Sequence, residues 1–207
     1  SLAFGRHVYP AQVHTEGIST ITLEDVKYAE AWGGVIKLIG RARKRDDGRL
    51  DCFVEPMLLP HSSQLAEVND VFNGILVRGD AIGDVVFYGR GAGKLPTASA
   101  VVADVIDEVK HLKARKYLFW EKGQEGYVAD YREAEASLLL RLRCNAPQAC
   151  MEELEKAVGR CTRVAVEGAP ANKLCLATPP VTQEKLEAVL PSLGGASLES
   201  RLRIADF

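Results

Sequence analysis

The hydrophobic period of this chain changes from two residues to 3.6 across one glycine-rich stretch, FYGRGAGKLPTASAVVAD (residues 87–104). Before it, short runs such as Arg49–Pro56 alternate apolar and polar residues between turn residues, which is typical of antiparallel strands. After it, the apolar positions fall on one face of a helix: Ala98, Val101, Val102, Val105, Ile106 and Val109. A chain that uses both periods is predicted to be an α+β protein.

Local signals place the elements ahead of the glycine stretch. Thr22–Asp25 has the form of a capping box, and Gly33 with Gly34 ends the helix that it starts. Asp46-Asp47-Gly48 predicts a hairpin between strands at 35–45 and 49–56. In the second strand Leu50, Cys52 and Val54 form the more apolar face. Another strand pair is expected at 71–77 and 84–88. We therefore expect an antiparallel or mixed sheet with helices on one face.

The last third of the chain has a different order of elements. Strands are predicted at 138–144, 163–167, 173–178 and 198–204, and helices at 150–158 and after Thr182. This βαββαβ order predicts a ferredoxin-like unit at 135–207. Its two helices would cover one sheet face and leave the other for a partner, a ligand or another domain. Residues 115–134 are expected to be a connector that lies against the rest, because they carry several aromatic side chains.

Composition excludes several classes of protein. The net charge of −2 gives no reason to expect a nucleic-acid or membrane partner, and no apolar run is long enough for a membrane span, so we expect a cytoplasmic protein. The five cysteines form no C-x-x-C pair and are interpreted as reduced core residues, with a disulfide or a zinc site as the alternative. The four histidines are scattered, so no metal site is expected.

The glycine stretch does not match the common phosphate-binding motifs. Gly93-Lys94 is followed by Leu95, so the hydroxyl residue of a Walker A loop is missing. The spacing is G-x-G-x-G after antiparallel strands, and not the G-x-G-x-x-G that opens a βαβ unit. Two interpretations remain from the residues alone: a structural turn, or an anion contact at the start of the following helix, strengthened by Lys94.

Four segments, in the same order along the chain, resemble homoserine dehydrogenases. They are EGISTITLEDVKYAEAWGGVIKLIGRA (16–42), VEPMLLP (54–60), VFNGI with Asn73, and GDAIGDVVFYGRGAGKLPTASAVVADVID (79–107). The resemblance spans about residues 1–112 and assigns 1–114 to the substrate-binding and dimerisation domain of that family. It implies interconversion of L-homoserine and L-aspartate 4-semialdehyde with NADP or NAD, in the pathway to threonine, methionine and isoleucine. It also implies a homodimer or a larger homo-oligomer.

The same resemblance gives the glycine stretch a role. In the family the chain returns to the nucleotide-binding domain near this loop, so Gly93, and less directly Gly91 and Ala92, would contact the cofactor. The helix at 97–113 would then be exposed, displaced or covered by a neighbouring chain, because the domain on which it packs in the family has no counterpart in this sequence.

The departures from the family are equally specific. No residue matches the family's Rossmann loop, its catalytic lysine or its substrate-binding carboxylates, so no catalytic residue is predicted and the chain alone is expected to be inactive. Glu16 and Asp80 are interpreted as structural carboxylates. The start at Ser1–Gly5, without a methionine or a helix-start signal, is expected to be the tail of a helix in a longer protein.

The unit at 135–207 resembles an ACT domain, a regulatory module found after the catalytic part in this family. Threonine would be the expected effector, and Asn145 and Ala146 in the loop after the first strand are the candidate ligand contacts. That loop lacks the usual glycine, and Asn145 has a structural alternative as a helix cap. The competing functions are a non-catalytic amino-acid-binding or oligomerisation module, and an unrelated nucleotide-binding protein built on the glycine stretch.

Overall fold

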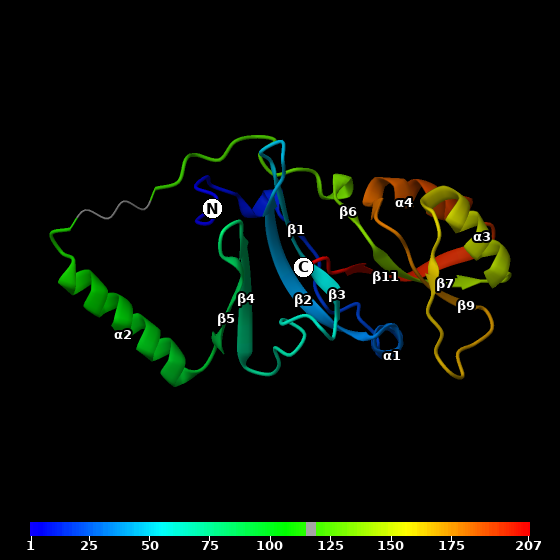
Figure 1. Cartoon of the computed structure of the whole chain (residues 1–207), viewed down its shortest axis with the longest axis horizontal. Helices are drawn as coiled ribbons and strands as arrows, with labels where there is room; N and C mark the ends of the chain where they lie inside the picture. Colours follow the sequence, from blue (N-terminus) through cyan, green and yellow to red (C-terminus); the bar gives the residue numbers. More distant parts are fainter. Residues whose placement is uncertain (115–118) are drawn as a thin grey trace. The chain divides into compact units, whose positions relative to one another are not determined.

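Figure 1 shows the computed structural model of the chain, which describes residues 1–114 and 119–207. Residues 115–118 of the expected connector therefore lie outside the described part. The chain forms two compact units. The first comprises Ser1–His61 and Trp120–Phe207, and the second comprises Ser62–Phe119. Helices and strands are mixed throughout, so the α+β expectation is confirmed.

The first unit holds most of the regular structure. Its elements are β1 (His14–Thr15), α1 (Leu23–Trp32), β2 (Gly34–Lys44), β3 (Leu50–Pro60), β6 (Glu135–Ala136), β7 (Leu138–Cys144), α3 (Pro147–Val158), β8 (Thr162–Arg163), β9 (Lys173–Ala177), β10 (Val181–Thr182), α4 (Gln183–Val189) and β11 (Ala196–Ile204). Short 3-10 turns lie at Pro10–Gln12 (η1), Tyr131–Glu133 (η2) and Leu190–Ser192 (η3). The second unit contains β4 (Phe72–Gly79), β5 (Gly83–Arg90) and α2 (Lys94–Lys110).

The local signals near the start of the chain produce the elements they predict. Thr22 Oγ1 accepts the N–H of Asp25 at 3.3 Å, and the Asp25 carboxylate accepts the N–H of Thr22 at 2.8 Å, which completes the capping box of α1. Gly33 ends the helix at φ 98°, a left-handed conformation that favours glycine. β2 and β3 pair antiparallel along their whole length, from Gly34 opposite Pro60 to Lys44 opposite Leu50.

One sheet joins the beginning and the end of the chain. Its strand order is β1-β3-β11-β7-β9-β8, and β2 pairs with β3 (Figure 1). β11 lies antiparallel to β7 and parallel to β3, with Arg203 opposite Met57 and Ile204 opposite Leu58. The compact units consequently do not follow the expected boundaries at 114 and 135. Residues 135–207 share a sheet with residues 1–61, whereas residues 62–119 form the separate unit.

Within residues 135–207 the strands β11-β7-β9-β8 are antiparallel to their neighbours, the topology of a βαββαβ unit. α3 and α4 pack on one face, where Leu140, Leu154 and Leu186 are fully buried in one core cluster. The opposite face was expected to receive a partner, a ligand or another domain, and it is covered by a helix of the segment assigned to the other domain. α1 of the same chain covers it, because Tyr28 and Ala29 pack with the β-sheet cluster that contains Leu139, Cys175 and Leu202.

The more apolar face of β3 is not the more buried one. Phe53 lies on the buried face together with Asp51 and Glu55, whereas Cys52 and Val54 are only half-buried. The buried carboxylates are neutralised by arginines: Asp51 by Arg43 at 2.7 Å, and Glu55 by Arg203 at 2.5 Å. These partners come from β2 and β11, so the alternation within β3 alone could not reveal which face would be covered.

The second unit is a hairpin followed by a long helix. β4 and β5 pair from Phe72 opposite Arg90 to Gly79 opposite Gly83, and Pro96 lies in the first turn of α2 as expected. No residue of α2 is buried, and the exposed fractions of its apolar stripe run from 48% at Ile106 to 62% at Val109. The expectation that this helix is exposed is therefore confirmed.

The described part of the connector lies against the first unit, as its aromatic content predicts. Glu121 forms a β-bridge with Arg6, and Val128 forms one with Leu50. The ring of Tyr131 stacks on His14 with their centroids 3.8 Å apart. The helix tail expected at residues 1–5 is instead a single turn, closed by a 2.9 Å hydrogen bond from Gly5 N–H to the Ser1 carbonyl.

Candidate functional site

The glycine loop joins β5 to α2 and is exposed along its length. Gly93 is the N-cap of α2, with φ 125° and ψ 149°, and its carbonyl accepts the N–H of Thr97 at 3.0 Å. A Cβ built on Gly91 would lie 1.9 Å from Nδ2 of Asn73, so a larger residue here would displace the Asn73 side chain. The structure thus brings the predicted contacts Gly91, Ala92 and Gly93 to one helix end and places Asn73 of β4 beside them.

The first turn of α2 offers donors to an anion. No side chain caps the helix, and the N–H groups of Lys94 and Leu95 precede the first helical hydrogen bond. The helix dipole adds partial positive charge there, and Lys94 adds a full one. These groups suit a phosphate or pyrophosphate. The geometry is therefore compatible with both interpretations of the loop, as a structural turn and as an anion contact.

The second predicted site, Asn145 and Ala146, lies between β7 and α3 and is exposed. Ala146 is the N-cap of α3, and the helix has no side-chain cap hydrogen bond. The alternative role of Asn145 as the cap is therefore wrong. Its Nδ2 lies 3.5 Å from the position that a Cβ on Gly195 would take, so the amide faces the start of β11.

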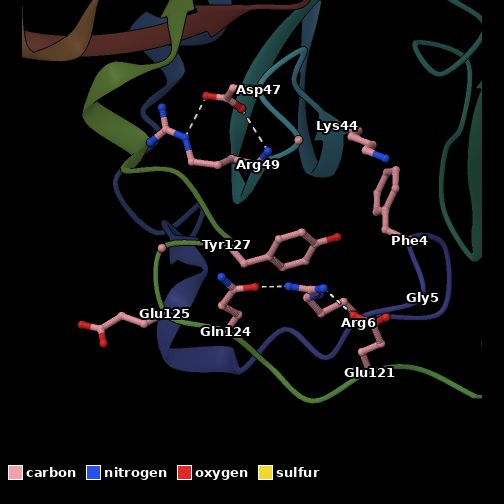
Figure 2. Close-up of a pocket in the computed structure, with 12 residues that line it drawn as sticks. Phe4, Gly5, Arg6, Lys44, Asp47, Arg49, Glu121, Gln124, Glu125 and Tyr127 are labelled. Carbon is pink, nitrogen blue, oxygen red and sulfur yellow. Dashed lines mark hydrogen bonds and ion pairs between the residues drawn. The ribbon is translucent and has the colours of Figure 1, made fainter.

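A polar cleft that the sequence did not indicate lies elsewhere in the first unit. Its volume is about 470 Å³, and Figure 2 shows its walls: the β2–β3 turn, residues 4–6 and residues 121–127. Arg6 hydrogen-bonds to Glu121 and Gln124, and its guanidinium carbon lies 5.1 Å from the centre of the Tyr127 ring. These three segments are distant in sequence and none carries a motif, so no sequence signal could have found the cleft.

A charged cluster joins α1 to the sheet that it covers. Arg141, with a side chain only 6% exposed, contacts Glu24 at 2.6 Å, Asp25 at 3.0 Å and Glu199 at 2.8 Å. Lys173 also binds Glu24, at 3.2 Å, and Glu199. Burial would raise the pKa of Glu199, but its hydrogen bonds to Lys173 and Arg143 lower it. The cluster is a structural clamp between segments more than a hundred residues apart.

The two carboxylates weighed in the sequence differ in their surroundings. Glu16 accepts from Arg201 at 2.6 Å and contacts His14 Nε2 at 2.7 Å. Burial would raise the pKa of Glu16, but His14 and Arg201 together lower it. Glu16 therefore has a structural ion-pair role. Asp80 is exposed in the β4–β5 turn, in the other unit.

The cysteines are free thiols in the structure. Four are buried and Cys52 is half-buried. Burial raises the pKa of Cys150 and Cys175 to about 12 and that of Cys161 to about 11, so these thiols stay protonated at neutral pH. Across residues 1–114 and 119–207, no three His, Cys, Asp or Glu side chains gather in a way that could hold a metal ion. No helix in those ranges has the length and apolarity needed to cross a bilayer.

Comparisons with known proteins agree for the first half of the chain. The family model described as homoserine dehydrogenase matches residues 1–106. The homoserine dehydrogenase of Pseudomonas aeruginosa is 46% identical over 110 residues, which are 53% of this chain and 25% of the relative. That of Helicobacter pylori is 35% identical over 142 residues, 69% of this chain and 33% of the relative.

Solved structures extend the similarity to the whole chain. A homoserine dehydrogenase from Thiobacillus denitrificans matches 99% of this chain with a TM-score of 0.82 and 30% identity, and one from S. aureus matches 99% with a TM-score of 0.75 and 26% identity. In both cases the chain spans 50% of the solved protein. The matched sequence and the shared fold lead to one conclusion: the chain belongs to the homoserine dehydrogenase family.

Proposed function

We propose that this chain supplies the substrate-side and C-terminal parts of an NAD(P)-dependent homoserine dehydrogenase, which interconverts L-homoserine and L-aspartate 4-semialdehyde. The observation that carries the proposal is the joint match of the family model to residues 1–106 and of a homoserine dehydrogenase structure to 99% of the chain. Because the chain spans half of that structure, the activity belongs to an assembly with further protein. The product would serve threonine, methionine and isoleucine synthesis in the cytoplasm.

The glycine loop is this chain's contribution to cofactor binding. When bound, NADP or NAD supplies or accepts the hydride. Gly91, Ala92 and Gly93 would contact the dinucleotide through exposed backbone, and Lys94 would add positive charge. The free N–H groups at the start of α2 fit a phosphate group, which supports this role. The exposed apolar stripe of α2 would be the surface on which a nucleotide-binding domain packs.

Catalysis would require residues from outside this chain. None of its residues matches the family's catalytic lysine or substrate carboxylates, and the sequence contains no G-x-G-x-x-G loop. The chain alone is therefore expected not to oxidise homoserine. Fused behind the nucleotide-binding half of the Pseudomonas aeruginosa relative, it is expected to restore NADP⁺-dependent oxidation, and Gly91→Val in the fusion is expected to raise the KM for the cofactor.

Homoserine oxidation by the chain alone would contradict the expectation that it is inactive. A folded fusion with no homoserine oxidation would contradict the proposed function itself. The matched control is Gly17→Val in the same fusion. A Cβ on Gly17 meets nothing within 4 Å, and Gly17 lies in the first unit, away from the glycine loop of the second.

A second candidate function rests on the βαββαβ topology of residues 135–207. In this proposal the unit is an ACT module that binds a small amino acid such as threonine at Asn145 and Ala146, or that pairs with a second copy in a homodimer. The exposed amide of Asn145, which does not cap α3, supports the ligand role. Calorimetry with L-threonine tests it. Heat that is lost in Asn145→Ala supports the ligand role, and no heat at millimolar threonine leaves only the pairing role.

A further inference from the structure

One side chain from a neighbouring strand rests against the glycine loop at residues 91–93. A Cβ built on Gly91 would lie 1.9 Å from Nδ2, 2.6 Å from Cγ and 3.3 Å from Cβ of Asn73, and these are its three nearest atoms. Asn73 belongs to β4, and Gly91 directly follows β5. Both residues lie in the second unit, so the contact is internal to one compact body. Asn73 therefore occupies the volume that a side chain at residue 91 would fill.

The pairing of the hairpin leaves Asn73 free to reach the loop. Asn73 lies opposite Gly89 in the ladder of β4 and β5, so its direct cross-strand neighbour has no side chain. A Cβ built on Gly89 would meet no atom within 4 Å, so the Asn73 side chain does not lie over this partner. It leans along the hairpin to Gly91 instead. The glycines at 89 and 91 together leave open the space through which Asn73 contacts the loop.

The loop gains from such a support because glycine is conformationally permissive. Gly93 adopts φ 125°, a conformation that residues with a side chain rarely take. This end of the loop is held by α2: the Gly93 carbonyl accepts the N–H of Thr97 at 3.0 Å, and a Cβ on Gly93 would lie 3.3 Å from the Pro96 ring. At the other end, the atoms nearest to the Cβ position of Gly91 all come from Asn73. Asn73 and the first turn of α2 thus hold the loop at its two ends.

We propose that Asn73 is a positioning residue for cofactor binding: by packing against Gly91, it keeps the glycine loop in the conformation that presents the start of α2. The inference rests on the function proposed above, in which this loop contacts NADP or NAD. Ordering a flexible loop on binding costs free energy, so a loop that is held in place beforehand binds more tightly. Asn73 acts through the loop, and no contact between its amide and the cofactor is required.

Backbone nitrogen relaxation of the whole chain, measured by NMR, tests the positioning without cofactor or turnover. The N–H of Gly91 is expected to have an order parameter near about 0.85 in the wild type, the value of rigid backbone, and below about 0.6 in Asn73→Ala. Asn73→Asp, which keeps the size and shape of the side chain, should retain the wild-type value. The matched control is Ile75→Ala, two residues along β4 on the same face and 62% exposed, which should leave Gly91 unchanged.

Three results of this measurement would overturn the proposal. The first is an equal order parameter for Gly91 in the wild type and in Asn73→Ala. The second is a loss of order in Asn73→Asp, because a packing role depends on the size of the side chain and not on its amide group. The third is an equal loss in Ile75→Ala, because the loosening would then come from the whole hairpin and not from the support that Asn73 gives to the loop.

Kinetics of the fusion described above separate positioning from chemistry. Asn73→Ala is expected to raise the KM for NADP⁺ about tenfold at unchanged kcat, as if roughly one more backbone residue had to be ordered on binding. Adding Gly91→Ala should raise the KM by less than the product of the two single effects, because both changes act on one contact. A wild-type KM in Asn73→Ala, a fall in kcat alone, or a full product of the two effects would overturn the proposal. A folded wild-type fusion without activity would contradict only the proposed function, since the relaxation result does not depend on turnover.

Discussion

Replacing Glu55 by glutamine is expected to destabilise the first unit by about 3–5 kcal/mol, the usual cost of leaving one member of a buried ion pair without its counter-charge. The side chains of Arg203 and Glu55 are 4% and 3% exposed, and Arg203 Nε lies 2.5 Å from Glu55 Oε1. Tyr131 donates its hydroxyl to the other Glu55 oxygen at 2.6 Å. Burial alone would lower the pKa of Arg203, but Glu55 and Tyr131 raise it. Because an arginine guanidinium is not deprotonated in proteins, Glu55→Gln leaves a buried cation without its counter-charge.

The same geometry predicts two further outcomes in this experiment. The paired variant Glu55→Leu with Arg203→Met removes both charges, and is expected to cost much less than Glu55→Gln, since apolar replacements of buried ion pairs are often neutral or stabilising. Glu187→Gln breaks an exposed pair with Arg132, whose side chains are 44% and 53% exposed. That control should cost only about 0–1 kcal/mol.

Urea unfolding followed by tryptophan fluorescence measures the effect. Both tryptophans, Trp32 and Trp120, lie in the first unit, so the signal does not follow the second unit. For a chain of this size, a loss of about 3–5 kcal/mol corresponds to a thermal midpoint lower by about 6–20 °C. A cost for Glu55→Gln no larger than that of Glu187→Gln would refute the reasoning, because the Glu55 carboxylate would then not be needed to neutralise Arg203.

Two other predictions concern acid stability and the exposed helix. Burial would raise the pKa of Asp25, but hydrogen bonds with Ser200 and Thr22 and the charge of Arg141 lower it. Its stabilising contribution is therefore complete above about pH 4 and is lost as the pH falls through the folded-state pKa. In Asp25→Asn, the urea midpoint should therefore depend less on pH between about pH 2 and pH 6. A pH dependence as steep as that of the wild type would contradict this prediction. Val102→Lys with Val105→Lys, at positions 56% and 57% exposed, should change the free energy of unfolding by only about 0.5 kcal/mol and reduce self-association in light scattering. A loss of several kcal/mol would show that the stripe is packed.

Elements with complete local signals could be predicted from the sequence. The capping box at Thr22, the left-handed stop at Gly33 and the turn at Asp46–Gly48 each act within a few residues, so α1, β2 and β3 lie where they were expected. The glycine loop likewise lies at the start of α2. Its role as a cofactor contact rests on family resemblance and stays a prediction.

Features that depend on distant segments could not be predicted. Arg203 is 148 residues from Glu55, and no periodicity within β3 reveals that its charged face would be buried against β11. The expected boundary at 135 follows the change of element order, but the parallel pairing of β11 with β3 crosses it. The polar cleft was missed for the same reason, because its walls come from residues 4–6, the β2–β3 turn and residues 121–127.

The parallel contact between β3 and β11 also dictates when the first unit can form during synthesis. β3 ends at Pro60, but its neighbour β11 begins at Ala196, so ribosomes must synthesise the whole segment between them before the sheet closes. Until then one edge of β3 offers unpaired backbone groups to any other nascent strand. Pairings of such long sequence separation are slow to form, because loop closure costs entropy before the contact is gained. Expression yield should therefore respond to chaperone supply and growth temperature more than to changes in the local signals of α1 or the β2–β3 turn.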